Sequence, residues 1–183
     1  MPRPLRFAHV VIQSYDMPRL AAWYRDVFDL DILVASPRVT FGTYDDEHHR
    51  FGFVQLAGEA PNDGRPSPLK HVAFAYAGLD DLVAQYRKLK AQGHLPAECV
   101  NHGPTLSFYY QDPDGNGVEF FIDRFATMEE SKAYMLSEPF QKNLFGYFID
   151  PEKIAEQFDA GVAHDEILAF DQKASEEFMR SRT

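Results

Sequence analysis

Three residues in this sequence have side chains that could hold a metal ion. His9 and His71 each stand at the start of a short apolar segment, and Glu119 lies inside the apolar run 118–122. Burying a carboxylate in such a run is costly unless the carboxylate is paired or binds a metal. Two imidazoles with one carboxylate leave coordination positions open and suit non-haem Fe(II) acting on dioxygen, although Mn(II), Ni(II) and Zn(II) accept the same ligand types.

Ordinary structural roles are the alternative for these residues. A single histidine at a strand start is more often a hydrogen-bonded structural residue than a ligand, and a strand with one face in water would turn Glu119 outward. The metal site is favoured because His9 and His71 occupy equivalent positions in an internal repeat.

The repeat relates two segments at a constant offset of 62 residues (71 minus 9). Each copy opens with an apolar strand-like segment, continues with apolar residues at helical spacing, and then runs through three more strand-like segments. Asp16 is placed to cap the first helix, with Pro18 in its first turn. The identical pairs are His9/His71, Val10/Val72, Leu20/Leu82, Ala22/Ala84, Tyr24/Tyr86 and Arg25/Arg87.

The pattern therefore predicts a βαβββ unit that occurs twice. The expected strands are 9–12, 31–36, 38–44 and 50–56 in the first copy, and 71–74, 97–100, 105–111 and 118–122 in the second. The turn 112–117, Asp-Pro-Asp-Gly-Asn-Gly, joins the last two strands, because Pro fixes φ and Gly or Asn accepts positive φ.

The composition divides the chain into a repeat domain and a helical extension. We expect one domain over 1–123, with modules at about 5–57 and 69–123 and a linker at 58–68 that is rich in Pro, Gly, Asn and Asp. Residues 124–183 contain helix signals: the pair Thr127 and Glu130, the pair Asp150 and Pro151, and helical spacing over 165–179. This extension would either cover a cavity or pack against a second subunit in a homodimer, and the sequence does not select between the two.

Charge and cysteine content narrow the environment and the partners. The 183 residues include 28 acidic and 18 Lys or Arg side chains, a formal charge of -10 that disfavours nucleic acid and anionic membranes. No apolar run reaches the 18 residues of a membrane span, and the start is not a signal sequence. The single cysteine, Cys99, suits a reducing compartment. These features predict a cytoplasmic protein.

Together the repeat, the strand-start histidines and the run from Phe108 to Glu119 resemble the vicinal oxygen chelate superfamily. That superfamily includes glyoxalase I, fosfomycin-resistance transferases and bleomycin-sequestering proteins. The resemblance covers about 5–123 and is greatest to the iron(II) extradiol catechol dioxygenases of the biphenyl-diol type, whose usual members have four βαβββ units. It implies an α+β fold in which two βαβββ modules pair into an open curved barrel around a metal site, with a helical C-terminal extension.

The resemblance also implies roles for individual residues. His9, His71 and Glu119 correspond to the ligands of Fe(II). His49, the second histidine of a pair, corresponds to the active-site acid/base, and His48 is left as structural. Tyr109, ten residues before Glu119, corresponds to the tyrosine that hydrogen-bonds the substrate oxygen. His102, in the preceding loop, corresponds to a further histidine of the site, although it stands closer to Tyr109 than the family pattern suggests.

The implied reaction is the ring cleavage of a catechol-type diol with dioxygen. His49 would take a proton from the substrate and later return one, since an ordinary histidine pKa of about 6.5 allows both states near neutral pH.

Three other functions use parts of the same pattern. A fosfomycin-type transferase needs the same metal ligands but not His49. Glyoxalase I needs a fourth ligand from the first module, where the offset of 62 points to Ala57, with Glu59 nearby in the linker. A metal-free drug-binding protein would need none of the ligands.

Overall fold

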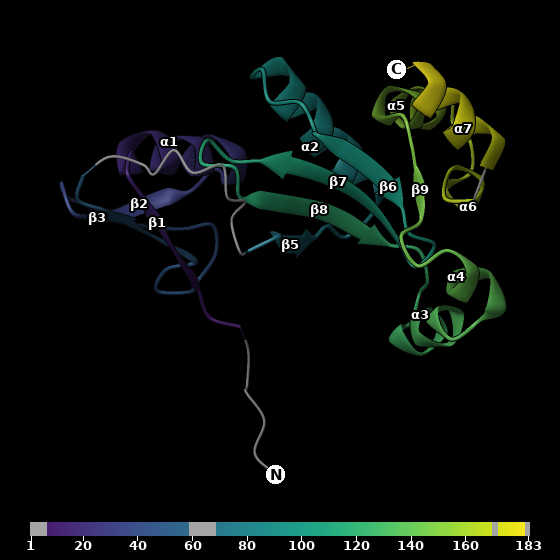
Figure 1. The fold of residues 1–183 in the computed structure, drawn as a ribbon, viewed down its shortest axis with the longest axis horizontal. Coiled ribbons are helices and arrows are strands. Elements are labelled where there is room, and N and C mark those ends of the chain that lie inside the picture. The colour runs from purple at the N-terminus through teal and green to yellow at the C-terminus, as the bar shows by residue number, and fades with distance from the viewer. Residues whose placement is uncertain (1–6, 59–68, 170–171, 182–183) are drawn as a thin grey trace, which may run out of the picture. The chain divides into compact units, whose positions relative to one another are not determined.

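A computed structural model describes residues 7–58, 69–169 and 172–181. Both modules have the predicted order of strand, helix and three strands (Figure 1). Residues 59–68 of the predicted linker lie outside the described residues. The first module contains β1 (Val10–Ser14), α1 (Met17–Phe28), β2 (Asp31–Ala35), β3 (Val39–Thr43) and β4 (Phe51–Gln55). The second contains β5 (His71–Ala75), α2 (Leu79–Ala91), β6 (Glu98–Asn101), β7 (Thr105–Gln111) and β8 (Gly117–Asp123).

Each module builds its own sheet, which confirms the α+β class. The strand orders are β1-β4-β3-β2 and β5-β8-β7-β6-β9, and the first strand of each module pairs in parallel with its last. The chain divides into two compact units. Unit 1 holds β1 to β4 with the loop Asp112–Asn116, and unit 2 holds the rest of the second module and the C-terminal extension. The assembly of the two sheets around one site stays a prediction.

The core of unit 1 lies between α1 and one face of its sheet. Asp16 caps α1 as predicted, because its side chain accepts a hydrogen bond from the Arg19 backbone N–H. Tyr24 on α1 is buried, and its ring centroid lies 4.8 Å from that of Phe51 and 5.1 Å from that of Phe53. Because side chains alternate along a strand, Gly52 faces the opposite side of the sheet.

The same alternation divides the sheet of unit 2 into a core face and a polar face. Phe108, Tyr110 and Phe120 are buried on the face covered by α2, where Tyr86 meets the Phe108 ring edge-on. Tyr109 and Glu119 are paired across β7 and β8 and therefore share the other face. Strand geometry alone thus separates the residues that pack from the residues that could react.

The strand register corrects one prediction from the repeat. Val10 pairs with Phe51, as Val72 pairs with Val118, so the structural equivalent of Glu119 is Gly52 and not Ala57. The prediction was wrong because the second module is five residues longer between its first and last strands (67 minus 62), so the offset does not stay constant. Glu59 lies outside the described residues.

The C-terminal extension begins with the predicted helices. It comprises α3 (Met128–Met135), α4 (Glu138–Lys142), β9 (Tyr147–Phe148), α5 (Pro151–Asp159), α6 (His164–Ile167) and α7 (Gln172–Ser181). Thr127 and Glu130 form the predicted capping box, and Asp150 caps α5. The helical pattern over 165–179 is divided between α6 and α7. The Leu168 carbonyl at the end of α6 accepts a hydrogen bond from the Asn101 side chain.

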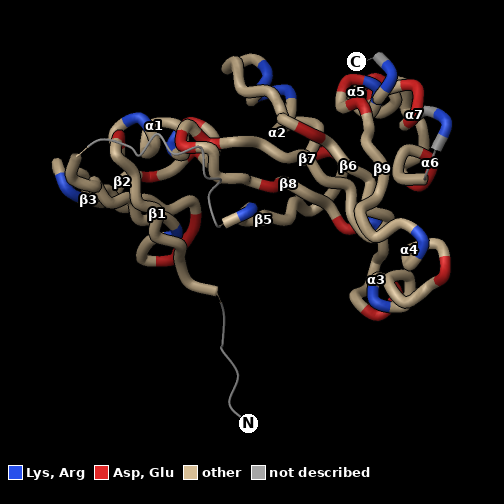
Figure 2. Tube along the Cα trace, in the orientation of Figure 1, with Lys and Arg blue, Asp and Glu red and all other residues tan. Residues whose placement is uncertain are grey.

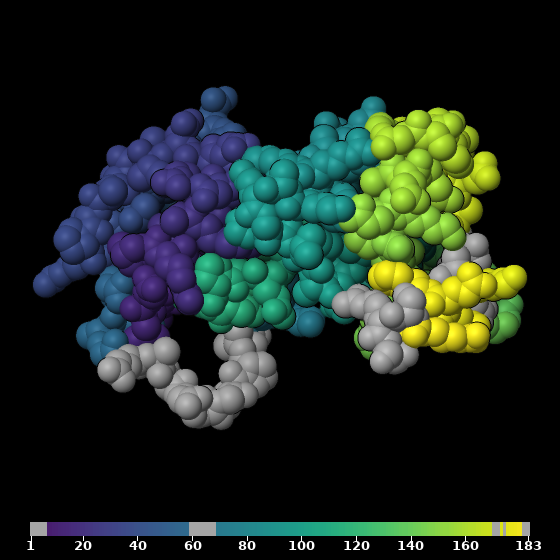
Figure 3. All heavy atoms as spheres, turned by 90° about the horizontal axis from the view of Figure 1, so that it is seen from above, coloured from purple at the N-terminus to yellow at the C-terminus, as the bar shows by residue number. Residues whose placement is uncertain are grey.

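Sheet pairing and ion pairs hold the extension on the second module. β9 extends the sheet through pairs of Val100 with Phe148 and Asn101 with Tyr147 (Figure 1). α5 packs on α2 (Figures 1 and 3). Glu152 on α5 accepts a hydrogen bond from the Tyr86 hydroxyl and pairs with Lys90. The acidic excess is spread over both units (Figure 2). Among the described helices, none is both long and apolar enough to cross a membrane.

Candidate metal centre

Four of the six predicted site residues form one chain of contacts in unit 2. His71 Nε2 lies 3.1 Å from Glu119 Oε2, and the Tyr109 hydroxyl donates to Glu119 Oε1 at 2.8 Å. His102 Nε2 lies 2.8 Å from the Tyr109 hydroxyl oxygen. The sequence placed these residues in one site, and within unit 2 the structure brings them into direct contact.

Close approach of β5 and β8 depends on Gly117. This residue pairs with His71, and a Cβ at Gly117 would lie 2.2 Å from the Lys70 carbonyl oxygen and 3.0 Å from His71 Cβ. No side chain fits there without moving the strand that carries His71. The glycine therefore lets the imidazole stand beside the last strand, two residues from Glu119.

Burial shifts the pKa values of Tyr109 and His102 in this group of contacting residues. Glu119 is 8 % exposed, and Tyr109 and His102 are half-buried. Burial, then the hydrogen bond to Glu119, raises the pKa of Tyr109, so the phenol keeps its proton and remains a donor. A phenol has one proton, and with that proton directed at Glu119 the Tyr109 oxygen accepts from His102. Burial lowers the pKa of His102 and favours its neutral form.

His71 has one ring nitrogen toward Glu119 and one without a partner. Its Nδ1 is buried and makes no hydrogen bond within the described part of the chain. Only Nε2 is thus engaged, and it faces the carboxylate that the sequence analysis assigned as a fellow ligand.

The other two predicted site residues lie together in unit 1, with His48 as a third. The His9 and His49 rings are stacked with centroids 4.3 Å apart, and the Nδ1 atoms of His48 and His49 are 2.6 Å apart. Burial lowers the pKa of His49, and neighbouring His9 and His48 lower it further. His49 is therefore neutral near pH 7 and able to accept a proton. Joining His9 of unit 1 with His71 and Glu119 of unit 2 stays a prediction.

Sequence reasoning missed two contributors to these clusters. His48 was interpreted as structural, yet its adjacency to His49 in a loop was a signal that both rings could lie together. The extension contributes Gly146, whose φ is +82° and where a Cβ would lie 2.4 Å from the Asn101 carbonyl oxygen and 2.7 Å from His102 Cα. No local pattern marks that contact, because it joins segments that are far apart in the chain.

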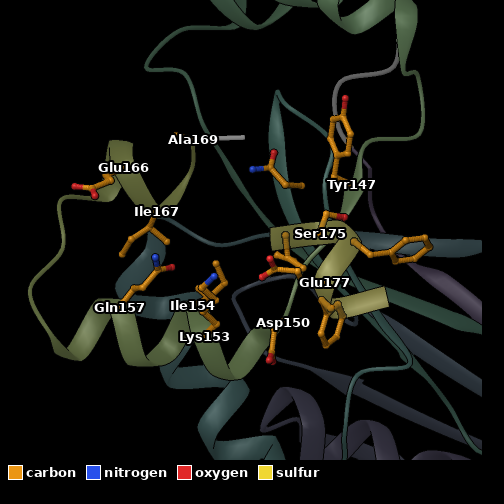
Figure 4. A pocket seen from close by; sticks show the side chains of 14 residues that line it. Tyr147, Asp150, Lys153, Ile154, Gln157, Glu166, Ile167, Ala169, Ser175 and Glu177 are labelled. Atoms are coloured by element: carbon orange, nitrogen blue, oxygen red, sulfur yellow. The ribbon is translucent and has the colours of Figure 1, made fainter. Parts of the chain in front are cut away.

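A separate cavity of about 570 Å³ lies where α5, α6 and α7 meet β6 and β9 (Figure 4). Lys153, Ile154 and Gln157 line it from α5, and Glu166 and Ile167 line it from α6. None of the six predicted site residues lines this cavity.

Comparisons with known proteins agree with this architecture. Residues 6–120 match the model of the Glyoxalase/Bleomycin resistance protein/Dioxygenase superfamily. The chain is 39% identical to biphenyl-2,3-diol 1,2-dioxygenase 3 of Rhodococcus globerulus and 38% identical to biphenyl-2,3-diol 1,2-dioxygenase 2 of the same organism. Each match covers 88% of this chain and 86% of the relative, so each runs into the C-terminal extension.

A solved structure shows the same fold at low sequence identity. The lactoylglutathione lyase of Agrobacterium tumefaciens is 18% identical, with a TM-score of 0.54 over 66% of this chain and 96% of that one. The family match covers more than half of the chain, and the two Rhodococcus relatives match most of it. The chain therefore belongs to the glyoxalase/bleomycin resistance protein/dioxygenase superfamily.

Proposed function

We propose that this protein is a cytoplasmic Fe(II)-dependent extradiol dioxygenase that cleaves the ring of a catechol-type diol with dioxygen. Residues 1–123 would form the catalytic domain and 124–183 its extension. The observation that carries the proposal is the chain of contacts from His71 through Glu119 and Tyr109 to His102. The 38–39% identity to proteins named biphenyl-2,3-diol 1,2-dioxygenase supports the choice of reaction.

The residues of unit 2 fit a divalent metal. Two donor atoms that bind one ion at right angles, each about 2.1 Å from it, lie about 3 Å apart. His71 Nε2 and Glu119 Oε2 are 3.1 Å apart, which suits both a hydrogen bond and a pair of neighbouring ligands. A buried carboxylate facing an imidazole is also the donor type that Fe(II) or Mn(II) accepts. His9 would be the third ligand.

Once bound, Fe(II) would act as a Lewis acid that lowers the pKa of a substrate hydroxyl and as a template that holds the diol near dioxygen. The protein has to supply the proton transfers. His49 suits the first transfer, because its lowered pKa leaves the imidazole neutral near pH 7. Its Nδ1 faces His48 Nδ1, so Nε2 is the nitrogen left to take a proton from a substrate hydroxyl and to return it later.

Tyr109 and His102 would hold the second substrate oxygen and the carboxylate in place. The Tyr109 hydroxyl stays protonated and donates a hydrogen bond to Glu119. It would therefore lie next to the coordination position that a diol would take. His102 fixes the orientation of that hydroxyl from its far side. His102 therefore acts through Tyr109, as a positioning residue.

Redox-neutral chemistry is the second candidate, since a fosfomycin-type transferase would use the same three ligands. The structure supports it less, because such chemistry has no use for a neutral His49 beside His9. A glyoxalase-like isomerase fits worse, since Gly52 occupies the position where the first module would supply a fourth ligand. A metal-free drug-binding protein would not need a carboxylate buried at position 119.

The test is dioxygen uptake by protein loaded anaerobically with Fe(II), with iron occupancy measured, across single-ring, biaryl and carboxylated catechols. We expect uptake equal to substrate loss and a coloured ring-opened product from at least one class. Glu119→Ala prepared in the same way should show no uptake, whereas the exposed Glu129→Ala should match the parent. Full iron occupancy without uptake on any catechol would contradict the proposal and favour redox-neutral metal chemistry.

A further inference from the structure

Unit 1 contains a group of three imidazoles that the proposed dioxygenase reaction does not need as a group. His9, His48 and His49, here called the histidine cluster, each offer a ring nitrogen, and these atoms all lie within 4.8 Å of one another. The His9 ring stacks on His49 and meets His48 edge-on, with centroids 4.3 Å and 5.7 Å apart. One nitrogen from each ring therefore lies within reach of the same small region.

Arg50 brings the two segments that carry these rings together. Its guanidinium donates to the Phe7 and Ala8 carbonyl oxygens, each at 2.9 Å, directly before His9. The same group binds both carboxylate oxygens of Asp45, at 2.9 and 3.0 Å, at the start of the loop that carries His48 and His49. One cation thus fixes the backbone on both sides of the histidine cluster, in which His9 and His48 are exposed and His49 is partly buried.

A carboxylate and an aromatic ring orient two of the imidazoles. The Glu47 side chain is 7 % exposed, and its Oε1 lies 3.6 Å from His48 Nε2, on the side away from His49. The Phe41 ring packs against His49 with centroids 4.7 Å apart. Metal-binding histidines commonly have a carboxylate on the side away from the ion, and Glu47 lies on that side of His48 at a distance longer than a hydrogen bond.

The Nδ1 atoms of His48 and His49 are in direct contact. At 2.6 Å, one Nδ1 donates its proton to the lone pair of the other, so the two imidazoles form an N–H···N hydrogen bond. Two nitrogen ligands of a tetrahedral Zn(II), each about 2.0–2.1 Å from it, lie about 3.3–3.4 Å apart. A divalent ion would therefore replace that proton with the two imidazoles moved apart, and would leave a fourth position for water.

We propose that the histidine cluster is a second metal site, selective for nitrogen-preferring divalent ions such as Zn(II) over Fe(II). Three imidazoles without a ligating carboxylate suit Zn(II), Cu(II) and Ni(II), which bind nitrogen donors more tightly than Fe(II) does. Because His9 can bind one ion at a time, Zn(II) here would exclude His9 from the iron site. That consequence rests on the proposed function, whereas Zn(II) binding itself does not.

The test is Zn(II) titration of the full-length chain without iron or dioxygen, by competition with a chromophoric chelator. In His71→Ala/Glu119→Ala, which removes both ligands of unit 2, we expect one Zn(II) per chain to remain bound. Adding His48→Ala, or separately His48→Gln, should weaken that binding at least tenfold. His164→Ala, which removes an exposed histidine of the extension, is the matched control and should leave it unchanged.

A second readout keeps the test independent of folding and of catalysis. X-ray absorption at the zinc edge should show three nitrogen neighbours of imidazole type in His71→Ala/Glu119→Ala, and two when His48→Ala is added. Loss of Zn(II) from His71→Ala/Glu119→Ala, or equal Zn(II) affinity with and without His48, would overturn the second site. Neither result would alter dioxygen uptake by the parent protein, so the two proposals fail separately.

Discussion

At equivalent positions of the two sheets, the second module has Tyr109 and Glu119 where the first has Phe41 and Gly52. Each module has a histidine at its first strand, since His9 directly precedes β1 and His71 opens β5. In the second module this imidazole faces a carboxylate 3.1 Å away, and in the first it faces two further imidazoles. The two modules share the strand pairing and differ in the residues on one face of each sheet.

The difference shows how one repeat can supply two kinds of chemistry. The Glu119 charge acts to raise the pKa of His102, although burial lowers that pKa on balance, whereas burial and then the neighbouring His9 and His48 all lower the pKa of His49. Keeping the anionic ligand in one module and the base in the other lets each have the protonation state its role requires. Substitutions in each module test that division.

Removing the carboxylate of the second module should have the largest effect. Glu119→Ala makes that module resemble the first at this position, so it should lose iron on anaerobic desalting and lose ring cleavage by about 10³-fold or more, since the metal template is gone. Iron content and dioxygen uptake measure this. Iron retained at the level of Glu129→Ala would show that the carboxylate is no ligand.

Removing the base of the first module should slow turnover and spare the metal. His49→Phe should retain iron and lose about 10²-fold in kcat, the usual scale for acid/base catalysis. His164→Phe is the control for loss of a histidine elsewhere. Turnover at the parent rate would remove His49 from the mechanism.

Replacing Tyr109 by phenylalanine, the residue at the equivalent position of the first module, should have a smaller effect. Tyr109→Phe copies Phe41 and deletes one hydrogen bond to Glu119, worth about 1–1.5 kcal/mol, so we expect about a tenfold fall in kcat with iron retained. Steady-state kinetics with iron analysis tests this, and an unchanged kcat would leave Tyr109 as a packing residue.

The extension contacts His102 through the loop that carries Gly146, so this loop should matter for the second module. Gly146→Ala should lower the free energy of unfolding by about 1–3 kcal/mol, from positive φ and from a Cβ too close to Asn101. Gly115→Ala has a similar φ of +84° but open space around it, so it isolates the strain of φ alone. Equal losses in urea unfolding would mean that the contact with Asn101 and His102 is unimportant.

The smallest effect concerns pH. His49 must be neutral to act as a base, and its pKa is lowered, so activity should persist below the ordinary histidine pKa of about 6.5 and fall as pH drops through the lowered value. Replacing His48 by Ala removes one cause of that lowering. The acid limb of kcat/KM should then move to higher pH, by less than about one pH unit. A shift to lower pH would contradict the assignment.

Local sequence signals predicted most of the fold. Strands, helix caps and the capping box at Thr127 were marked by alternation and by residues with side-chain oxygens that bond backbone N–H groups. The pairing of Tyr109 with Glu119 also follows from sequence, since both are five residues from Asp114 at the centre of the turn. Such features depend on residues that are close in sequence, so local patterns are enough to predict them.

Long-range register and packing could not be read in the same way. The offset of 62 pointed to Ala57, because a five-residue difference in length between the modules leaves no mark on composition. The contact of Gly146 with His102 and the addition of β9 to the sheet join segments whose patterns are independent. Likewise, Arg50 joins the two segments of the histidine cluster through hydrogen bonds to the Phe7 and Ala8 carbonyl oxygens. Because every residue has a backbone carbonyl, the sequence does not mark these partners.

The central claim is that the two modules supply one iron site, with His9 from the first and His71 and Glu119 from the second. The most direct measurement is anaerobic Fe(II) affinity of His9→Ala beside His71→Ala, with His164→Ala as control. The account predicts that both lose affinity to a similar degree, by at least about 100-fold, since loss of an outer partner of a ligand alone costs about 10–100-fold. Parent-like affinity in His9→Ala, with affinity lost in His71→Ala, would show that the first module contributes no ligand.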